Sequence, residues 1–199
     1  MNVPNVLTMS RFVMAAAVLA LLTVDVPFAV SVAFILFVLA CLTDALDGHL
    51  ARNVYGCTDF GKLMDPLADK VLVCAVLVRL VGYRLTPQAA GLLPAWMAVL
   101  ILAREFLVTG LRTLAADKGR VLAASGWGKI KTITQMVALN AVLLALALRE
   151  DWLPAEMLPE VDAVLTPATF WVFGAVTLLT VVSGYTYVRD NADLLKSSS

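Results

Sequence analysis

Six segments of about 20 apolar residues dominate this chain and limit what it can fold into. A helix of that length crosses the hydrocarbon core of a bilayer and satisfies its own backbone hydrogen bonds there. The segments cover roughly Val6–Thr23, Pro27–Leu50, Leu67–Tyr83, Leu92–Ala116, Ile130–Leu148 and Pro167–Val188. With 61% hydrophobic and 15% charged residues, the chain is also much more apolar than a soluble domain. The sequence therefore predicts an all-α, polytopic membrane protein with six transmembrane helices.

Charged residues are distributed unevenly between the connections, although the net charge is zero. Acidic residues predominate before the second and sixth segments. Basic residues gather on the opposite side: Arg52, Lys62, Arg112, Lys118, Arg120, Lys129, Lys131, Arg189 and Lys196. Because cytoplasmic loops carry an excess of Lys and Arg, we expect both termini inside, although Arg79 and Arg84 oppose this orientation. We expect one helical domain over residues 1–190 and a short cytoplasmic tail over residues 191–199.

Four aspartates lie around the connection between the second and third segments, where a carboxylate is costly unless a cation or partner faces it. If the second helix continues to Arg52, then Asp44, Asp47 and Arg52 lie on one face of that helix, within an arc of roughly 140°. Asp65 and Asp69 are four residues apart and share a face of the next helix. Oxygen ligands select Mg²⁺, Mn²⁺ or Ca²⁺, and Mg²⁺ leaves positions open for phosphates. The aspartates therefore predict one or two hard cations and a phosphate ester or anhydride as ligand.

The same segment carries turn residues and possible phosphate contacts. We expect the third helix to begin near Asp65, with Pro66 in its first turn. The twelve residues between Arg52 and Asp65 would then return the chain and set the two aspartate pairs opposite each other. Gly48 and Gly61 would let a nucleotide or phosphate approach the backbone, and Arg52 offers a guanidinium fork to phosphate oxygens.

The spacing Asp-x2-Asp-Gly-x2-Ala-Arg-x8-Gly-x3-Asp-x3-Asp resembles the signature of the CDP-alcohol phosphotransferases at every position. The matching residues are Asp44, Asp47, Gly48, Ala51, Arg52, Gly61, Asp65 and Asp69. The stretches NVPNVLTMSR, LPAWMAVLILAREFLVTGLR and SGWGKIKTITQMVAL are similar to the bacterial phosphatidylglycerophosphate synthase branch of that family. The resemblance extends to about Leu139, and the region of the fifth and sixth helices beyond it carries no recognised motif.

This resemblance implies a six-helix enzyme of the bacterial inner (cytoplasmic) membrane, usually a homodimer, with its active site at the cytoplasmic face. It would move a phosphatidyl group from CDP-diacylglycerol to sn-glycerol 3-phosphate and release CMP. The implied ligands of two Mg²⁺ or Mn²⁺ ions are Asp44, Asp47, Asp65 and Asp69. Asp69 would also accept the proton of the attacking hydroxyl. The residues implied to hold the CDP moiety are Gly48, Arg52 and Gly61.

The acceptor implied by the resemblance is a dianion, so it requires cations beside an acidic site. The candidates are Arg104, Arg112, Lys129 and Lys131. Arg104 would lie roughly 18 Å along its helix at about 1.5 Å per residue, and should therefore face an internal cavity. Glu105 can pair elsewhere or offset that charge. Alternatively, Arg104 forms a structural ion pair with Glu105. Lys129 and Lys131 could also be present only because cytoplasmic connections are rich in basic residues.

Other functions remain open from the sequence. The same chemistry could use inositol phosphate, serine or phosphatidylglycerol as acceptor. A divalent-cation transporter could also contain buried acids, but its acids should be spread across the bilayer depth, whereas these four are clustered. A catalytically silent scaffold should show an eroded signature. No basic stripe interleaved with aromatics is present, so nucleic acid is not an expected partner.

Overall fold

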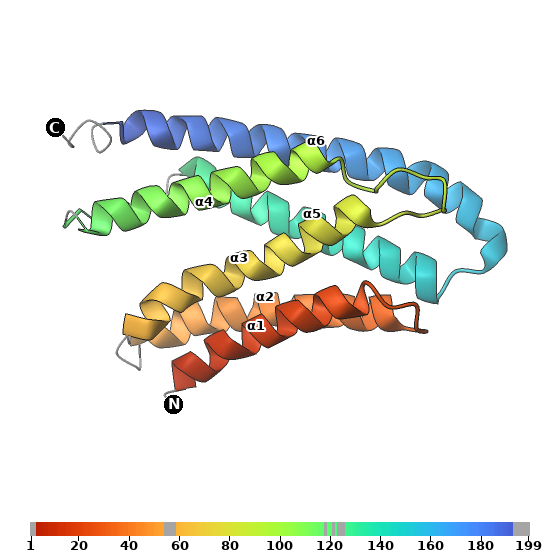
Figure 1. Cartoon of the computed structure of the whole chain (residues 1–199), viewed down its shortest axis with the longest axis horizontal. Helices are drawn as coiled ribbons and strands as arrows, with labels where there is room; N and C mark the ends of the chain where they lie inside the picture. Colours follow the sequence, from red (N-terminus) through yellow and green to blue (C-terminus); the bar gives the residue numbers. More distant parts are fainter. Residues whose placement is uncertain (1–2, 54–58, 118, 121, 123–125, 193–199) are drawn as a thin grey trace.

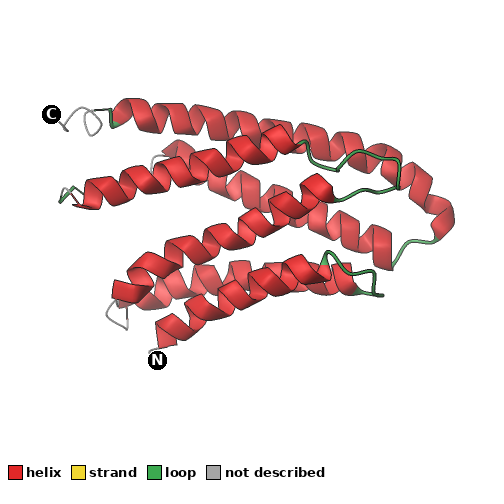
Figure 2. Ribbon diagram, in the orientation of Figure 1, coloured by secondary structure: helices red, strands yellow, loops and turns green. Residues whose placement is uncertain are grey.

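The computed structural model describes residues 3–53, 59–117, 119–120, 122 and 126–192. Within these ranges the side chains of residues 3–8, 44–53, 59–66, 68, 69 and 117 are not described. The helices are α1 (Val3–Leu21), α2 (Ala29–Asn53), α3 (Asp59–Gly82), α4 (Ala95–Asp117), α5 (Gly126–Asp151), the 3₁₀ helix η1 (Ala155–Met157) and α6 (Leu158–Asp190). Figure 2 shows helices and loops and no strand in the described part of the chain. The all-α prediction is confirmed.

The helices form one elongated bundle, and Figure 1 shows which connections share each end. The end that we call the site end holds the α2–α3 and α4–α5 connections, the start of α1 and the end of α6. The opposite, far end holds the other three connections. Helix α1 packs against α2 and α3, α5 packs against α2 and α6, and α4 packs against α3 and α6. Fully buried apolar side chains, including Phe37, Leu77, Leu143 and Phe173, fill the space between the helices.

The third helix begins earlier than the sequence predicts. Helix α3 starts at Asp59, so Pro66 lies inside the helix and the expected first-turn position for it is wrong. The connection from α2 is shortened to residues 54–58. The prediction failed because hydropathy marks only the apolar part of a helix, and α3 begins with a polar turn before its apolar run. Both aspartate pairs consequently lie inside helices.

The predicted start of the sixth helix at Pro167 is also wrong. Helix α6 begins at Leu158, with Pro159 in its first turn. Backbone N–H groups of the first turn have no acceptor within the helix, so a proline there removes no hydrogen bond. Pro167 lies in the helix interior and removes one backbone hydrogen bond there. The acidic residues of the first two turns lowered the local hydropathy and concealed this part of the helix.

The outer surface of the bundle is apolar. Two helical stretches in the described residues, α5 and the run Ala155–Asp190, are long and apolar enough to cross a membrane, so this criterion does not confirm six crossings. Each of the six α-helices nevertheless presents a large apolar side chain that is between 54% and 68% exposed. These side chains are Val13, Ile35, Val78, Val99, Ile133 and Leu178. Such a surface suits lipid rather than water.

The buried Arg149 forms the centre of a network of charged and polar contacts at the far end. The Arg149 guanidinium donates to both carboxylate oxygens of Asp162, at 2.5 and 2.7 Å, to Glu150 at 2.6 Å and to the Leu85 carbonyl at 3.0 Å. The Tyr83 hydroxyl donates to the same Glu150 carboxylate at 2.7 Å. These contacts tie α3 and its connection to α5 and α6.

Arg79, which opposes the orientation with both termini inside, has a structural role at the far end. Arg79 donates from Nε to the Leu22 carbonyl at 2.7 Å, just beyond the last residue of α1. Its guanidinium carbon also lies 4.5 Å from the ring centroid of Tyr83. Carbonyls at a helix C-terminus lack helical partners, so Arg79 satisfies a group that would otherwise need water.

Candidate active site

The backbone places the four aspartates in two helices at the site end. Helix α2 is continuous through Asn53, so Asp44 and Asp47 belong to one helix, as the sequence predicts. Asp65 and Asp69 lie four residues apart within α3. The prediction that the two pairs face each other concerns side chains that lie outside the described residues. The same is true of the predicted CDP contacts Gly48, Arg52 and Gly61.

The chemistry of this donor set fits a divalent cation. Two carboxylate-bearing helix segments are joined by residues 54–58, so the chain itself keeps them near each other. Four carboxylates offer only oxygen ligands, which Mg²⁺ and Mn²⁺ prefer. Among the residues whose side chains are described, no group of three or more His, Cys, Asp or Glu could hold a metal ion. No described cluster therefore competes with the aspartate segment for that role.

A cationic pocket of about 500 Å³ opens beside this segment between α3, α4 and α5. Its charged lining residues are Lys70, Arg104, Glu105, Arg112 and Lys129. Three of the four predicted acceptor cations, namely Arg104, Arg112 and Lys129, are thus brought together. Lys70 was not predicted from the sequence, and it follows Asp69 directly in α3. The lining of the pocket therefore begins at the residue that follows Asp69 in α3.

Arg104 is held mainly by a neutral partner. Its Nη2 donates to the Ser183 hydroxyl at 2.6 Å, whereas its contact with the adjacent Glu105 carboxylate is 3.4 Å long. Its Nε atom is buried without a hydrogen-bond partner. The Arg104 side chain is 11% exposed. Arg104 thus forms the ion pair with Glu105 that is the alternative role for it, while its shorter hydrogen bond goes to a neutral hydroxyl.

Lys131 has a different environment from the other predicted cations. The residue is 2% exposed, and its ammonium group forms an ion pair with the Glu105 carboxylate. It does not line the cationic pocket but an adjoining cavity of about 310 Å³. Glu105 therefore pairs with Lys131 and also partly offsets the charge of Arg104. The structure does not group Lys131 with the three cations of the pocket.

Helix α6, beyond the recognised motifs, supplies partners for both arginines of α4. The Arg112 Nε donates to the Tyr187 hydroxyl at 3.2 Å, and the Arg112 guanidinium carbon lies 5.7 Å from the Tyr187 ring centroid. Ser183, one turn earlier in α6, binds Arg104. The sequence offered one unused signal: Ser183 and Tyr187 are polar positions four residues apart in an apolar helix, where polar groups usually seek a partner on another helix.

The sequence profile of the CDP-alcohol phosphatidyltransferases matches residues 1–183. The chain belongs to this family of membrane-associated enzymes. The chain is 38% identical to the "CDP-diacylglycerol–glycerol-3-phosphate 3-phosphatidyltransferase" of Bacillus subtilis, with 100% of this chain and 99% of the relative covered. It is 38% identical to the "Probable phosphatidylglycerophosphate synthase" of Mycobacterium tuberculosis over 100% and 87% of the two chains. It is 35% identical to the Rickettsia bellii protein that bears the same name as the B. subtilis relative, over 94% of each.

The family match confirms the resemblance carried by the aspartate signature. It also assigns the chain to a class of enzymes, so the transporter and scaffold interpretations have no support. Enzymes of this family generally use divalent metal ions, in agreement with the donor chemistry of the four aspartates.

Proposed function

We propose that this enzyme is a phosphatidylglycerophosphate synthase, which transfers the phosphatidyl group of CDP-diacylglycerol to sn-glycerol 3-phosphate. The names of the B. subtilis and R. bellii relatives describe this reaction for those proteins. The observation that carries the proposal here is the cationic pocket beside Asp69. Among the described residues that line it, four are cationic, Lys70, Arg104, Arg112 and Lys129, and one is acidic, Glu105, which also pairs with Lys131. Such a pocket suits a dianionic phosphate monoester.

In the proposed reaction, the primary hydroxyl oxygen of the acceptor attacks the phosphorus next to diacylglycerol. The bond from this phosphorus to the bridging pyrophosphate oxygen breaks, and CMP leaves. Asp69 accepts the hydroxyl proton, and Arg104, Arg112 and Lys129 hold the acceptor phosphate. Lys131 acts indirectly by fixing Glu105. Residues Gly48, Arg52 and Gly61 hold the CDP moiety.

The proposed metal ligands are Asp44, Asp47, Asp65 and Asp69. Two Mg²⁺ or Mn²⁺ ions bound there would neutralise the charge that develops on the phosphate oxygens. The protein's own contribution is to align the hydroxyl, the phosphorus and the leaving group, because phosphoryl-type displacement depends on positioning more than on covalent catalysis.

The proposed setting is the bacterial inner membrane. In this proposal all six α-helices cross the bilayer, the site end faces the cytoplasm, and residues 1–190 form one catalytic domain followed by a tail at 191–199. The apolar outer surface of every helix supports six crossings. The enzyme is proposed to act as a homodimer among membrane lipids, by analogy with its family.

Purified enzyme in detergent micelles tests the function directly. CMP release is followed with CDP-diacylglycerol, Mg²⁺ and one acceptor at a time: glycerol 3-phosphate, inositol phosphate, serine or phosphatidylglycerol. We expect release with glycerol 3-phosphate alone, complete loss in EDTA, and recovery when Mg²⁺ or Mn²⁺ is added back. The cationic pocket disfavours serine, which lacks a phosphate. Inositol phosphate carries a phosphate and is therefore the stricter test of acceptor specificity. Release with inositol phosphate in place of glycerol 3-phosphate would contradict the proposed acceptor.

A further inference from the structure

A second cavity, of about 310 Å³, lies deeper in the bundle than the cationic pocket. Its lining includes Cys41 of α2, Cys74 of α3, Glu105 of α4, and Lys131, Gln135 and Met136 of α5. The two cavities adjoin, because Lys70, Glu105 and Thr132 line both of them. A small molecule anchored in the cationic pocket could therefore extend into the second cavity.

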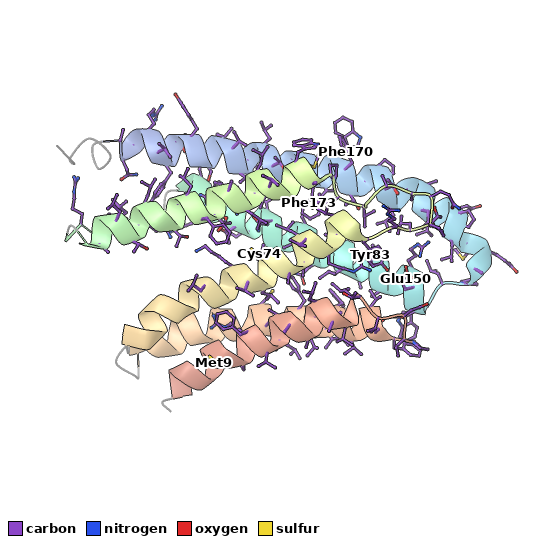
Figure 3. The ribbon with its side chains drawn as sticks, in the orientation of Figure 1. Met9, Cys74, Tyr83, Glu150, Phe170 and Phe173 are labelled. Carbon is purple, nitrogen blue, oxygen red and sulfur yellow. The ribbon has the colours of Figure 1, made fainter. Side chains whose placement is uncertain are left out.

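The position of this cavity relative to the aspartates follows from the helices. Cys41 is three residues before Asp44 in α2, and Cys74 is five residues after Asp69 in α3. Figure 3 shows Cys74 in the middle of the bundle, away from Tyr83 and Glu150 at the far end. The cavity thus begins about one helical turn from the aspartates, in the direction of the far end of the bundle.

The side-chain oxygen of Gln135 is a buried polar atom of this cavity without a hydrogen-bond partner in the described part of the chain. The residue is 3% exposed. Two other polar groups of the lining have partners within the protein, since Glu105 pairs with Lys131 and the Thr132 hydroxyl donates to the Gly128 carbonyl at 3.0 Å. Buried amides nearly always have partners, because an unpaired one loses its hydrogen bonds to water. A carboxamide that lines a cavity is suited to a ligand hydroxyl.

We propose that this cavity is the subsite for the carbon chain of the acceptor, and that Gln135 hydrogen-bonds the hydroxyl that does not react. The inference rests on the proposed function. Glycerol 3-phosphate has three polar groups on three carbons: the phosphate goes to the cationic pocket, the primary hydroxyl to Asp69, and the secondary hydroxyl to Gln135. Gln135 is then a specificity-determining residue that is separate from the phosphate-binding cations.

This arrangement makes the middle hydroxyl a criterion of acceptor choice. An acceptor without it leaves the buried Gln135 side-chain oxygen unpaired, and sites built to bind a substrate hydroxyl discriminate strongly against analogues that lack it. The matched analogue is 3-hydroxypropyl phosphate, which keeps the phosphate and the reacting hydroxyl and lacks only the middle one.

The test compares kcat/KM for the two acceptors in wild type and in Gln135→Met, which keeps the side-chain length and removes the hydrogen-bonding groups. We expect wild type to prefer glycerol 3-phosphate by about 10-fold or more, as loss of one buried hydrogen bond implies. In Gln135→Met the activity with glycerol 3-phosphate should fall about 10-fold, while that with the analogue changes by no more than about 2-fold. The preference then nearly disappears, and KM for CDP-diacylglycerol is unchanged.

Met136→Leu is the matched control, because Met136 lines the same cavity and offers no strong hydrogen bond. It should keep the wild-type preference. An equal loss with both acceptors in Gln135→Met would assign Gln135 a structural role and overturn the inference, as would a preserved preference. Equal use of both acceptors by wild type would overturn it without any variant. Absence of CMP release by wild type with glycerol 3-phosphate would instead refute the proposed function, and the inference with it.

Discussion

Gly184 allows helix α6 to approach Arg104, and its replacement by alanine tests the role of that arginine. A Cβ atom at position 184 would lie 3.0 Å from Cγ of Arg104, closer than ordinary van der Waals contact. The same helix offers a matched control at Gly174, where a Cβ would lie 3.9 Å from Cε of Met97. Both glycines face α4, so the two substitutions share the helix and the packing partner. They differ in whether Arg104 is displaced.

The expected size of the effect follows from the side-chain geometry. In Gly184→Ala the Arg104 stem must move by a few tenths of an ångström, which strains its rotamer or its 2.6 Å hydrogen bond to Ser183. An off-rotamer side chain costs about 0.5–1.5 kcal/mol. At about 1.4 kcal/mol per tenfold change in binding, KM for glycerol 3-phosphate should rise roughly 2- to 10-fold. Alanine also favours the helix by about 1 kcal/mol over glycine in both variants.

The assay is initial-rate CMP release with each substrate varied in turn, accompanied by thermal unfolding in detergent. Gly174→Ala should leave both KM values unchanged and keep or raise the unfolding temperature. Gly184→Ala should raise KM for the acceptor only. The reasoning is refuted if Gly184→Ala behaves like its control, or if it raises KM for CDP-diacylglycerol by the same factor.

Three further substitutions separate the parts of the enzyme. Asp69→Asn should abolish CMP release while CDP-diacylglycerol still binds in an equilibrium assay, and unchanged turnover would exclude Asp69 as the base. Arg104→Ala should raise KM for glycerol 3-phosphate at least about 10-fold, because a buried charge contact is lost; a selective loss of CDP-lipid affinity would contradict this. Arg149→Ala should destabilise the far end by about 1–3 kcal/mol, because Asp162 loses a charged hydrogen-bond partner, with both KM values unchanged. An unaltered unfolding temperature would show that this network contributes little.

Most of the fold could be predicted from the sequence, because apolar runs of bilayer length are a strong local signal. All six predicted segments correspond to helices. The errors concern helix starts, where α3 and α6 extend beyond the apolar run into polar turns. Hydropathy responds to the solvent around a side chain, whereas a helix continues as long as its backbone hydrogen bonds do. Pro66 and Pro167 were therefore taken as starts although both lie within helices.

The candidate site was predictable where the signal is carried by charged residues at fixed spacing. The structure brings Arg104, Arg112 and Lys129 into one pocket, as expected of cations that share a ligand. The contributions of Ser183 and Tyr187 were missed, because their spacing indicates only that they seek a partner on another helix, and the packing of α6 against α4 decides which residues they bind. The pairing of Lys131 with Glu105 was likewise decided by the α4–α5 contact.

The predicted acceptor cations differ in whether their protein partners are neutral or charged. Arg104 and Arg112 are oriented mainly by hydroxyl groups, of Ser183 and Tyr187, which accept hydrogen bonds without contributing a negative charge. Lys131 is instead paired with a carboxylate and is almost fully buried. A carboxylate in place of the Ser183 hydroxyl would hold Arg104 equally well but would cancel the field that a dianion needs. Neutral orientation of the arginines therefore keeps the pocket positive, while the neutralised Lys131–Glu105 pair forms the boundary between the phosphate pocket and the cavity of Gln135.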